Sequence, residues 1–245
     1  MLELLQFGIR SRLRVGWMSP ETSDMTNRFS VRCCGLILLF AAFTALEAGE
    51  VRRSGPQVGT QIPGSFSPYN LNGKRKGSYH CLVCEYALGP VALIFAREPA
   101  KEKDQTLTDL LKKLDKAVDE NRRQDLRAVV VFLSPDASSS ANDPKLSDPA
   151  KLVEEAAARD KLIERLQPRA DSLRNVIVCI FPAAGPKSYA INDKAEVTLV
   201  FYNRFKVLAN AAFGEGEFQQ NDADGFMKTV TDALAKEKKK PVPKK

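Results

Sequence analysis

Three short, continuous apolar runs constrain the fold of this 245-residue chain more than any other feature. They read PVALIFA at 90–96, LRAVVVFLS at 126–134 and NVIVCIF at 175–181. A strand with one face in water alternates apolar and polar residues, whereas a strand covered on both faces is apolar throughout. The runs therefore predict three central strands of a sheet that is covered on both faces.

Helical patterns lie between these runs. Residues 106–123 place leucine and valine side chains at helical spacing, which predicts an amphipathic helix. A second helix is expected from Ala150 to about Leu166, ended by Pro168, because proline lacks the amide hydrogen that a helix interior needs. Apolar strands that alternate with helices are typical of parallel sheets.

The last third of the chain predicts a different connection. Residues 195–203 and 206–213 both have a strand pattern, and only Arg204 and Phe205 separate them, so we expect an antiparallel hairpin. A final helix is expected over 223–237. The complete order predicts an α/β fold of three layers, with a mixed central sheet flanked by helices.

The N-terminal segment has the pattern of an export signal. Arg28 and Arg32 precede an apolar run that ends at Leu46, and small residues follow, which predicts a signal peptide cleaved after Ala48. The run has about 14 residues and a membrane span needs about 20, so no stable membrane span is expected. We interpret 1–48 as a signal peptide with an over-extended N-terminus, in which translation begins at Met25. The expected location is secreted or periplasmic.

The formal net charge of +7 is concentrated at the C-terminus, where residues 236–245 read KEKKKPVPKK. Such a tail is expected to be disordered, and it could contact anionic surfaces. It contains no aromatic residue for base stacking, so no specific nucleic-acid partner is expected. The domain organisation predicted is a linker at 49–57, one domain at 58–235 and a Lys-rich tail at 236–245.

The start of the domain carries a recognisable pattern. Val58-Gly59, Pro63, Phe66 and Gly73 are followed by Gly89-Pro90 and the first apolar run. This pattern, together with the order of strands and helices, resembles the thioredoxin-like superfamily of thiol-disulfide oxidoreductases and peroxiredoxins. The resemblance covers residues 58–235. It implies a thioredoxin-like fold, and protein thiols or disulfides as partners.

The chemistry that the resemblance implies does not map onto the usual positions. In those enzymes the reactive cysteine follows the first core strand and lies at a helix N-terminus, where free amide groups stabilise the thiolate. Here Ala100 and Lys103 stand at about those positions, and Val197 stands near the position of the usual cis-proline. The usual active-site cysteines are therefore missing.

Cys81 and Cys84 are the credible reactive pair, but they precede the first core strand instead of following it. Seven strand residues separate the two ends of that strand by about 23 Å. Basic residues just upstream would favour a thiolate: Lys74, Arg75, Lys76 and His80.

Three other interpretations of this pair stay open. The cysteines could form a structural disulfide with each other, or one of them could pair with Cys179, which otherwise reads as a small buried hydrophobe. A zinc site would need more ligands than Cys81, Cys84 and the single histidine supply. Covalent haem attachment needs a histidine where Glu85 stands. No cofactor and no metal are therefore expected.

Two functions follow from these interpretations. The first is an exported thioredoxin-like protein that exchanges disulfides through a displaced Cys-x-x-Cys pair, with Cys81 and Cys84 as catalytic residues. The alternative is a catalytically silent thioredoxin-fold binding module in which the cysteines are structural. Arg97 and Glu98, at the end of the first core strand, could line a residual substrate groove, although a surface ion pair is the preferred interpretation.

Overall fold

A computed structural model of the chain describes residues 53–98, 105–137 and 148–238. The predicted signal peptide and most of the Lys-rich tail lie outside the described residues. Ala100 and Lys103 lie outside them as well.

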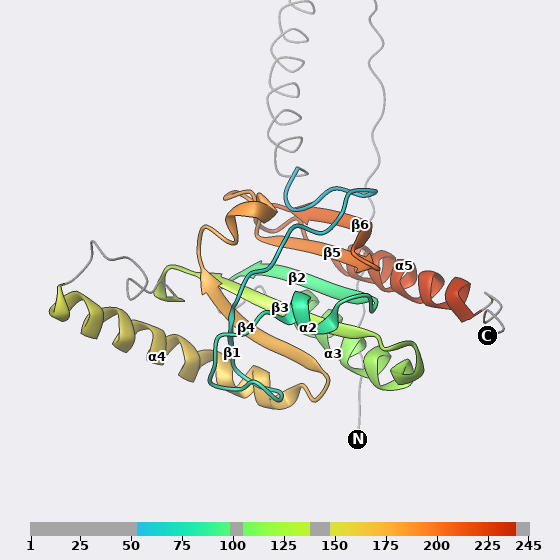
Figure 1. Cartoon of the computed structure of the whole chain (residues 1–245). Helices are drawn as coiled ribbons and strands as arrows, with labels where there is room; N and C mark the ends of the chain where they lie inside the picture. The colour runs from blue at the N-terminus through green and yellow to red at the C-terminus, as the bar shows by residue number, and fades with distance from the viewer. Residues whose placement is uncertain (1–52, 99–104, 138–147, 239–245) are drawn as a thin grey trace, which may run out of the picture. The chain divides into compact units, whose positions relative to one another are not determined.

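One mixed sheet forms the centre of the domain (Figure 1). Its strands, in chain order, are β1 (Tyr69–Asn70), β2 (Val91–Arg97), β3 (Arg127–Ser134), β4 (Val176–Pro182), β5 (Val197–Asn203) and β6 (Lys206–Phe213). Their order across the sheet is β1-β4-β3-β2-β5-β6. β2, β3 and β4 are parallel to one another, whereas β1, β5 and β6 each run antiparallel to their neighbours. All three apolar runs are central strands, as predicted.

The long helices cover one face of this sheet. They are α3 (Gln105–Glu120), α4 (Pro149–Ser172) and α5 (Gln220–Lys238), and their apolar residues pack in one core with alternate residues of the central strands. Since β2, β3 and β4 follow one another in the same direction across the sheet, right-handed crossovers place α3 and α4 on the same face.

The opposite face is covered by shorter segments. Helix α2 (Leu82–Tyr86), the 3₁₀ turn η4 (Lys187–Tyr189) and the N-terminal segment around Ile62 and Phe66 pack on it and enclose a second core. The three-layer α/β class with a mixed central sheet is confirmed.

The hairpin and one helix boundary test the sequence predictions most directly. β5 and β6 are joined by Arg204 and Phe205, as expected, and both residues have positive φ angles of 50° and 62°. The predicted end of the second helix is wrong, since α4 continues through Pro168 to Ser172. Pro168 is exposed, and the last turn is held by the burial of Ala170 and by backbone carbonyls that accept bonds from Asn72.

The start of the domain forms a small hairpin on the edge of the sheet. β1 pairs with β4, and Tyr69 also pairs with Tyr79, so the chain folds back around the loop at 71–76. The Asn72-Gly73 pair lies in that loop, where Gly73 has a φ of 74°. A side chain at Gly73 would collide with Ile177, because a Cβ there would lie 2.5 Å from its Cδ1. This hairpin brings the loop at 71–76 to the end of the sheet where β3 and β4 begin, and residues 77–80 run back alongside β1.

Candidate functional site

Cys81 and Cys84 are joined by a disulfide, with their Cα atoms 5.3 Å apart. Cys81 is the N-cap of α2, and the amide of Cys84 donates a hydrogen bond of 3.2 Å to Cys81 Sγ. Cys84 is exposed and Cys81 is partly exposed. The two predicted residues are therefore brought together at a site that solvent and a protein partner can reach.

Helix α2 leads from the disulfide toward the end of the sheet where the parallel strands begin, which we call the amino pole, since Tyr86 contacts Arg127 at the start of β3. α2 ends at Tyr86, four residues before Pro90, and β2 then runs from Val91 to Arg97 toward the other end, the carboxyl pole. The cysteines therefore precede the first core strand in sequence, while the amide of His80, next to Cys81, donates to the carbonyl of Pro68 beside the C-terminal half of β4. The usual reactive position of this kind of fold, after that strand, belongs to the carboxyl pole.

Packing holds α2 on the second face of the sheet. Leu82 and Val83 are only 5% and 7% exposed and belong to the core below β2 and β3. The ring of Tyr86 stacks against Arg127, whose guanidinium carbon lies 5.8 Å from the ring centroid. Burial is the main cause that raises the pKa of Tyr86 above its ordinary value, and the neighbouring Glu85 adds to it. The hydroxyl is therefore neutral at physiological pH.

A hydrogen bond joins the residues at the two ends of the Cys-x-x-Cys segment. His80 Nε2 lies 2.6 Å from Glu85 Oε2, and the two side chains are 28% and 36% exposed. His80 directly precedes Cys81, and Glu85 directly follows Cys84. This hydrogen bond closes the short segment that carries the disulfide.

The basic residues upstream lie in the loop at 71–76 and in the segment that follows it. Lys76 pairs with Asp171 at 3.9 Å, with both side chains more than half exposed. Within the part of the chain that the structure describes, the side chains of Lys74 and Arg75 have no such partner. Lys74 contributes instead to a pocket described below.

Cys179 is fully buried within β4, and its thiol donates a 3.2 Å hydrogen bond to Asn70 Oδ1. Burial raises the pKa of this thiol well above its ordinary value of 9.0. It is not part of a disulfide, so the interpretation that pairs Cys179 with Cys81 or Cys84 is wrong. The interpretation of Cys179 as a small buried hydrophobe is confirmed.

The carboxyl pole is occupied by structural polar contacts. Arg97 donates hydrogen bonds of 2.9–3.1 Å to the carbonyl oxygens of Ala183, Asn192 and Ala195. Glu98 accepts two bonds from Arg165, at 2.8 and 3.0 Å, and the bonds to Glu98 and then Asp136 raise the pKa of that guanidinium. Glu98 therefore forms an ion pair with Arg165. Arg97 stabilises the loop that leads into β5 through its three hydrogen bonds to backbone carbonyls.

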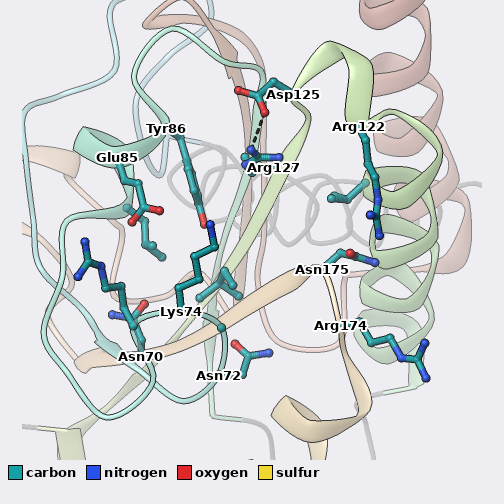
Figure 2. A pocket seen from close by; sticks show the side chains of 15 residues that line it. Asn70, Asn72, Lys74, Glu85, Tyr86, Arg122, Asp125, Arg127, Arg174 and Asn175 are labelled. Carbon is teal, nitrogen blue, oxygen red and sulfur yellow. Dashed lines mark hydrogen bonds and ion pairs between the residues drawn. The ribbon is translucent and has the colours of Figure 1, made fainter.

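A pocket of about 490 Å³ opens at the amino pole, beside α2 (Figure 2). Its walls come from the loop at 71–76, from α2, from the C-terminal end of α3 and from the first residues of β3 and β4. The charged and aromatic lining residues are Lys74, Arg75, Glu85, Tyr86, Arg122, Asp125, Arg127 and Arg174. Sequence analysis noted the basic loop but missed this pocket, because its residues come from four segments that only the fold assembles.

Neither a metal site nor a membrane helix is found in the described residues. No group of three or more His, Cys, Asp and Glu side chains among them could hold a metal ion. No helix among them is long and apolar enough to cross a membrane.

Comparison with known proteins gives similarity of structure alone. No family model matches the chain, and no curated protein matches it. Similar solved structures include a protein of Chlorobium tepidum described as a thiol:disulfide interchange protein DsbE, with a TM-score of 0.46, 14% identity, and coverage of 73% of this chain and 98% of that one. A second, described as a protein disulfide isomerase of Bacteroides thetaiotaomicron, has a TM-score of 0.48, 13% identity, and coverage of 74% and 94%.

A third is the mitochondrial 2-Cys peroxiredoxin of Plasmodium falciparum, with a TM-score of 0.44, 9% identity, and coverage of 77% and 100%. These similarities concern the fold at most. The assignment of the fold rests on the observed strand order, on the parallel β2-β3-β4 unit with its crossover helices, and on the β5-β6 hairpin followed by α5.

Proposed function

From the premise that this chain has a thioredoxin-like fold, we propose that it is an exported protein that exchanges disulfides with protein partners through Cys81 and Cys84. The observation that carries the proposal is the accessible Cys81–Cys84 disulfide at the start of α2. A buried disulfide could not reach a partner's sulfur atoms, whereas Cys84 is exposed. Exchange requires a thiolate that can contact its target.

The reaction has two steps. In the reduced protein, the Cys81 thiolate attacks one sulfur of a partner's disulfide, forms a mixed disulfide and releases one partner thiolate, which takes a proton from water. The Cys84 thiolate then attacks Cys81 Sγ, closes the Cys81–Cys84 bond and releases the second partner thiolate. Two electrons pass from the cysteine pair to the partner, and a partner dithiol reverses both steps.

The contacts of the pair favour Cys81 as the attacking residue. Its sulfur accepts the amide hydrogen of Cys84, and a hydrogen bond to the charged form of an acid stabilises that form. The hydrogen-bonded pair of His80 and Glu85 flanks the two cysteines in the sequence.

Export is part of the proposal because the sequence and the chemistry agree on it. The N-terminal pattern is that of a signal peptide, and structural or catalytic disulfides persist in oxidising compartments. The proposed location is the periplasm or the medium, and the proposed partners are proteins with accessible thiols or disulfides.

One observation favours the alternative, a silent binding module whose disulfide is structural. α2 has only five residues, yet Leu82 and Val83 cover the second core, so the disulfide could serve to hold this short helix in place. In that case reduction would lower the stability of the protein, and exchange with partners would not occur.

Two measurements distinguish these functions. For exchange, we expect a reduction potential above about −300 mV in a glutathione redox series, the range of labile disulfides. We also expect the protein to catalyse insulin reduction by dithiothreitol, and Cys81→Ser and Cys84→Ser to abolish that catalysis. Cys179→Ala is the matched control, since it removes the third thiol of the described residues and should leave catalysis unchanged. A lower potential, with Cys81→Ser as active as the native protein, would show that the disulfide is structural.

A further inference from the structure

The pocket at the amino pole has an excess of positive charge that the protein does not neutralise. Five basic side chains line it, against the two acids Glu85 and Asp125. Both acids already have partners, since Glu85 is hydrogen-bonded to His80 and Asp125 pairs with Arg127. Among the basic residues, Arg122 is paired with Asp119. Within the described residues, Lys74, Arg75 and Arg174 make no ion pair or side-chain hydrogen bond.

The basic side chains come from several segments and surround one pocket. Figure 2 shows Lys74 directed into the region between α2 and the sheet, near Tyr86, while Arg122 extends from the α3 side toward Asn175. A concave site with a charge of one sign attracts counter-ions more strongly than a flat surface does. The pocket is therefore suited to an anion.

Apolar groups form another part of the lining. Leu82 and Val118 are each 5% exposed, and Ile177 lies against Gly73 of the loop at 71–76. The Tyr86 ring adds an aromatic surface, and its hydroxyl is a neutral donor at physiological pH. A ligand with an apolar or aromatic body would cover this surface while its charged group meets the basic residues.

The amide side chains of the pocket are not available to a ligand. Asn72 Nδ2 donates to the carbonyls of Ala170, Leu173 and Val176, and its Oδ1 accepts from the amide of Val178. Asn175 is likewise bound to Asp115 through its side chain and its backbone. These residues fix the walls, and charged groups remain to recognise a ligand.

We infer that this pocket binds a small organic anion, whose phosphate or carboxylate group contacts Lys74 and the neighbouring guanidinium groups and whose apolar body lies on Leu82, Val118 and Ile177. Binding does not require that the cysteines be redox-active, so the inference stands apart from the proposed function.

The test is a calorimetric titration of the oxidised full chain with phenyl phosphate, benzoate and inorganic phosphate at physiological salt. We expect saturable binding of at least one of the two aromatic anions, and binding of phenyl phosphate about tenfold tighter than that of inorganic phosphate, because the ring covers apolar surface. Lys74→Gln should weaken binding about tenfold, the loss expected for a charge-assisted hydrogen bond. Arg174→Gln should also weaken it, by a smaller factor.

Lys76→Gln is the matched control, since it removes the same charge from the same loop but does not line the pocket. It should change the affinity less than about twofold, because exposed charges outside the pocket are screened by salt. Circular dichroism checks that each variant is folded. The inference is overturned if neither aromatic anion shows saturable binding below about 10 mM, if Lys74→Gln and Lys76→Gln have equal effects, or if inorganic phosphate binds as tightly as phenyl phosphate.

Discussion

At the scale of single residues, Asn72 has an unusual number of contacts. Its side chain donates to three carbonyl oxygens and accepts one amide hydrogen, and it is 9% exposed. Two of these partners, Ala170 and Leu173, lie at the end of α4, and the other two, Val176 and Val178, lie in β4. Asn72 therefore joins the small N-terminal hairpin to the core of the domain.

We predict that Asn72→Ala lowers the free energy of unfolding by about 2–3 kcal/mol, because it leaves several buried backbone groups without a partner. Urea denaturation measures the change. Asn121→Ala is the control, since Asn121 is half-buried and donates to one carbonyl only, that of Ala117. Its cost should be below about 1 kcal/mol, and equal costs for the two variants would contradict the role given to Asn72.

Phe205 is a second residue whose conformation is costly. It occupies the second position of the β5-β6 turn with a φ of 62°, a region that non-glycine residues rarely adopt. Its backbone carbonyl accepts a hydrogen bond from the amide of Ile62. Any residue at position 205 would supply this carbonyl.

Phe205→Gly should therefore raise the free energy of unfolding by about 1 kcal/mol, since glycine adopts this conformation without steric cost. Thermal denaturation measures the change, and Phe218→Gly, a substitution of a partly buried aromatic residue with no positive φ, should be destabilising. A lower melting temperature for Phe205→Gly would mean that its ring, 37% exposed, contributes more than the strain removes.

At the scale of elements, tertiary contacts of α4 outweigh the tendency of Pro168 to end a helix. Pro168 lies inside the helix, where it deprives the carbonyl of Glu164 of its hydrogen-bond partner. The helix continues because Leu166 and Ala170 are buried against the sheet.

We predict that Pro168→Ala raises the free energy of unfolding by about 1–3 kcal/mol, as alanine restores the missing bond and has a much higher helix propensity. Chemical denaturation tests this, with Glu164→Ala on the same helix as a control that should change stability by less than about 0.5 kcal/mol. No gain in Pro168→Ala would indicate that the helix has adapted fully to its proline.

At the scale of the whole molecule, the second core contains three weak acids that are buried in their neutral forms. Burial raises the pKa values of Tyr189 and Tyr202 above the ordinary 10.0, and that of Cys179 above 9.0. In the unfolded chain these groups lose their protons at the ordinary values. Stability from their neutral forms is therefore complete below about pH 9 and is lost as the pH rises toward the folded-state values.

The urea midpoint is accordingly expected to fall between pH 8 and pH 11. Cys179→Ala should make the fall less steep between pH 9 and pH 10, where the thiol of the unfolded chain ionises. A midpoint that is constant over this range would show that these groups ionise in the folded protein.

Sequence patterns predicted the sheet well because its central strands are uniformly apolar, and each predicted strand end lies within about two residues of the observed one. α2 escaped prediction because five residues are too few to show helical periodicity.

Cys81 and Cys84 were found as a pair from their spacing, and the alternative with Cys179 could be excluded only once the strand register buried that thiol beside Asn70. The pocket depends on contacts between residues about 100 positions apart, such as Asn72 with Leu173.

Helix α2 supplies Cys84 to the disulfide, and it supplies Glu85 and Tyr86 to the wall of the pocket. Reduction of the disulfide and binding of an anion in the pocket are coupled if either of them changes the position of this helix. An anion that binds the oxidised protein more tightly than the reduced protein would make the disulfide harder to reduce. Reduction would weaken the binding of that anion by the same factor. The midpoint potential of the Cys81–Cys84 pair would then depend on the concentration of that anion.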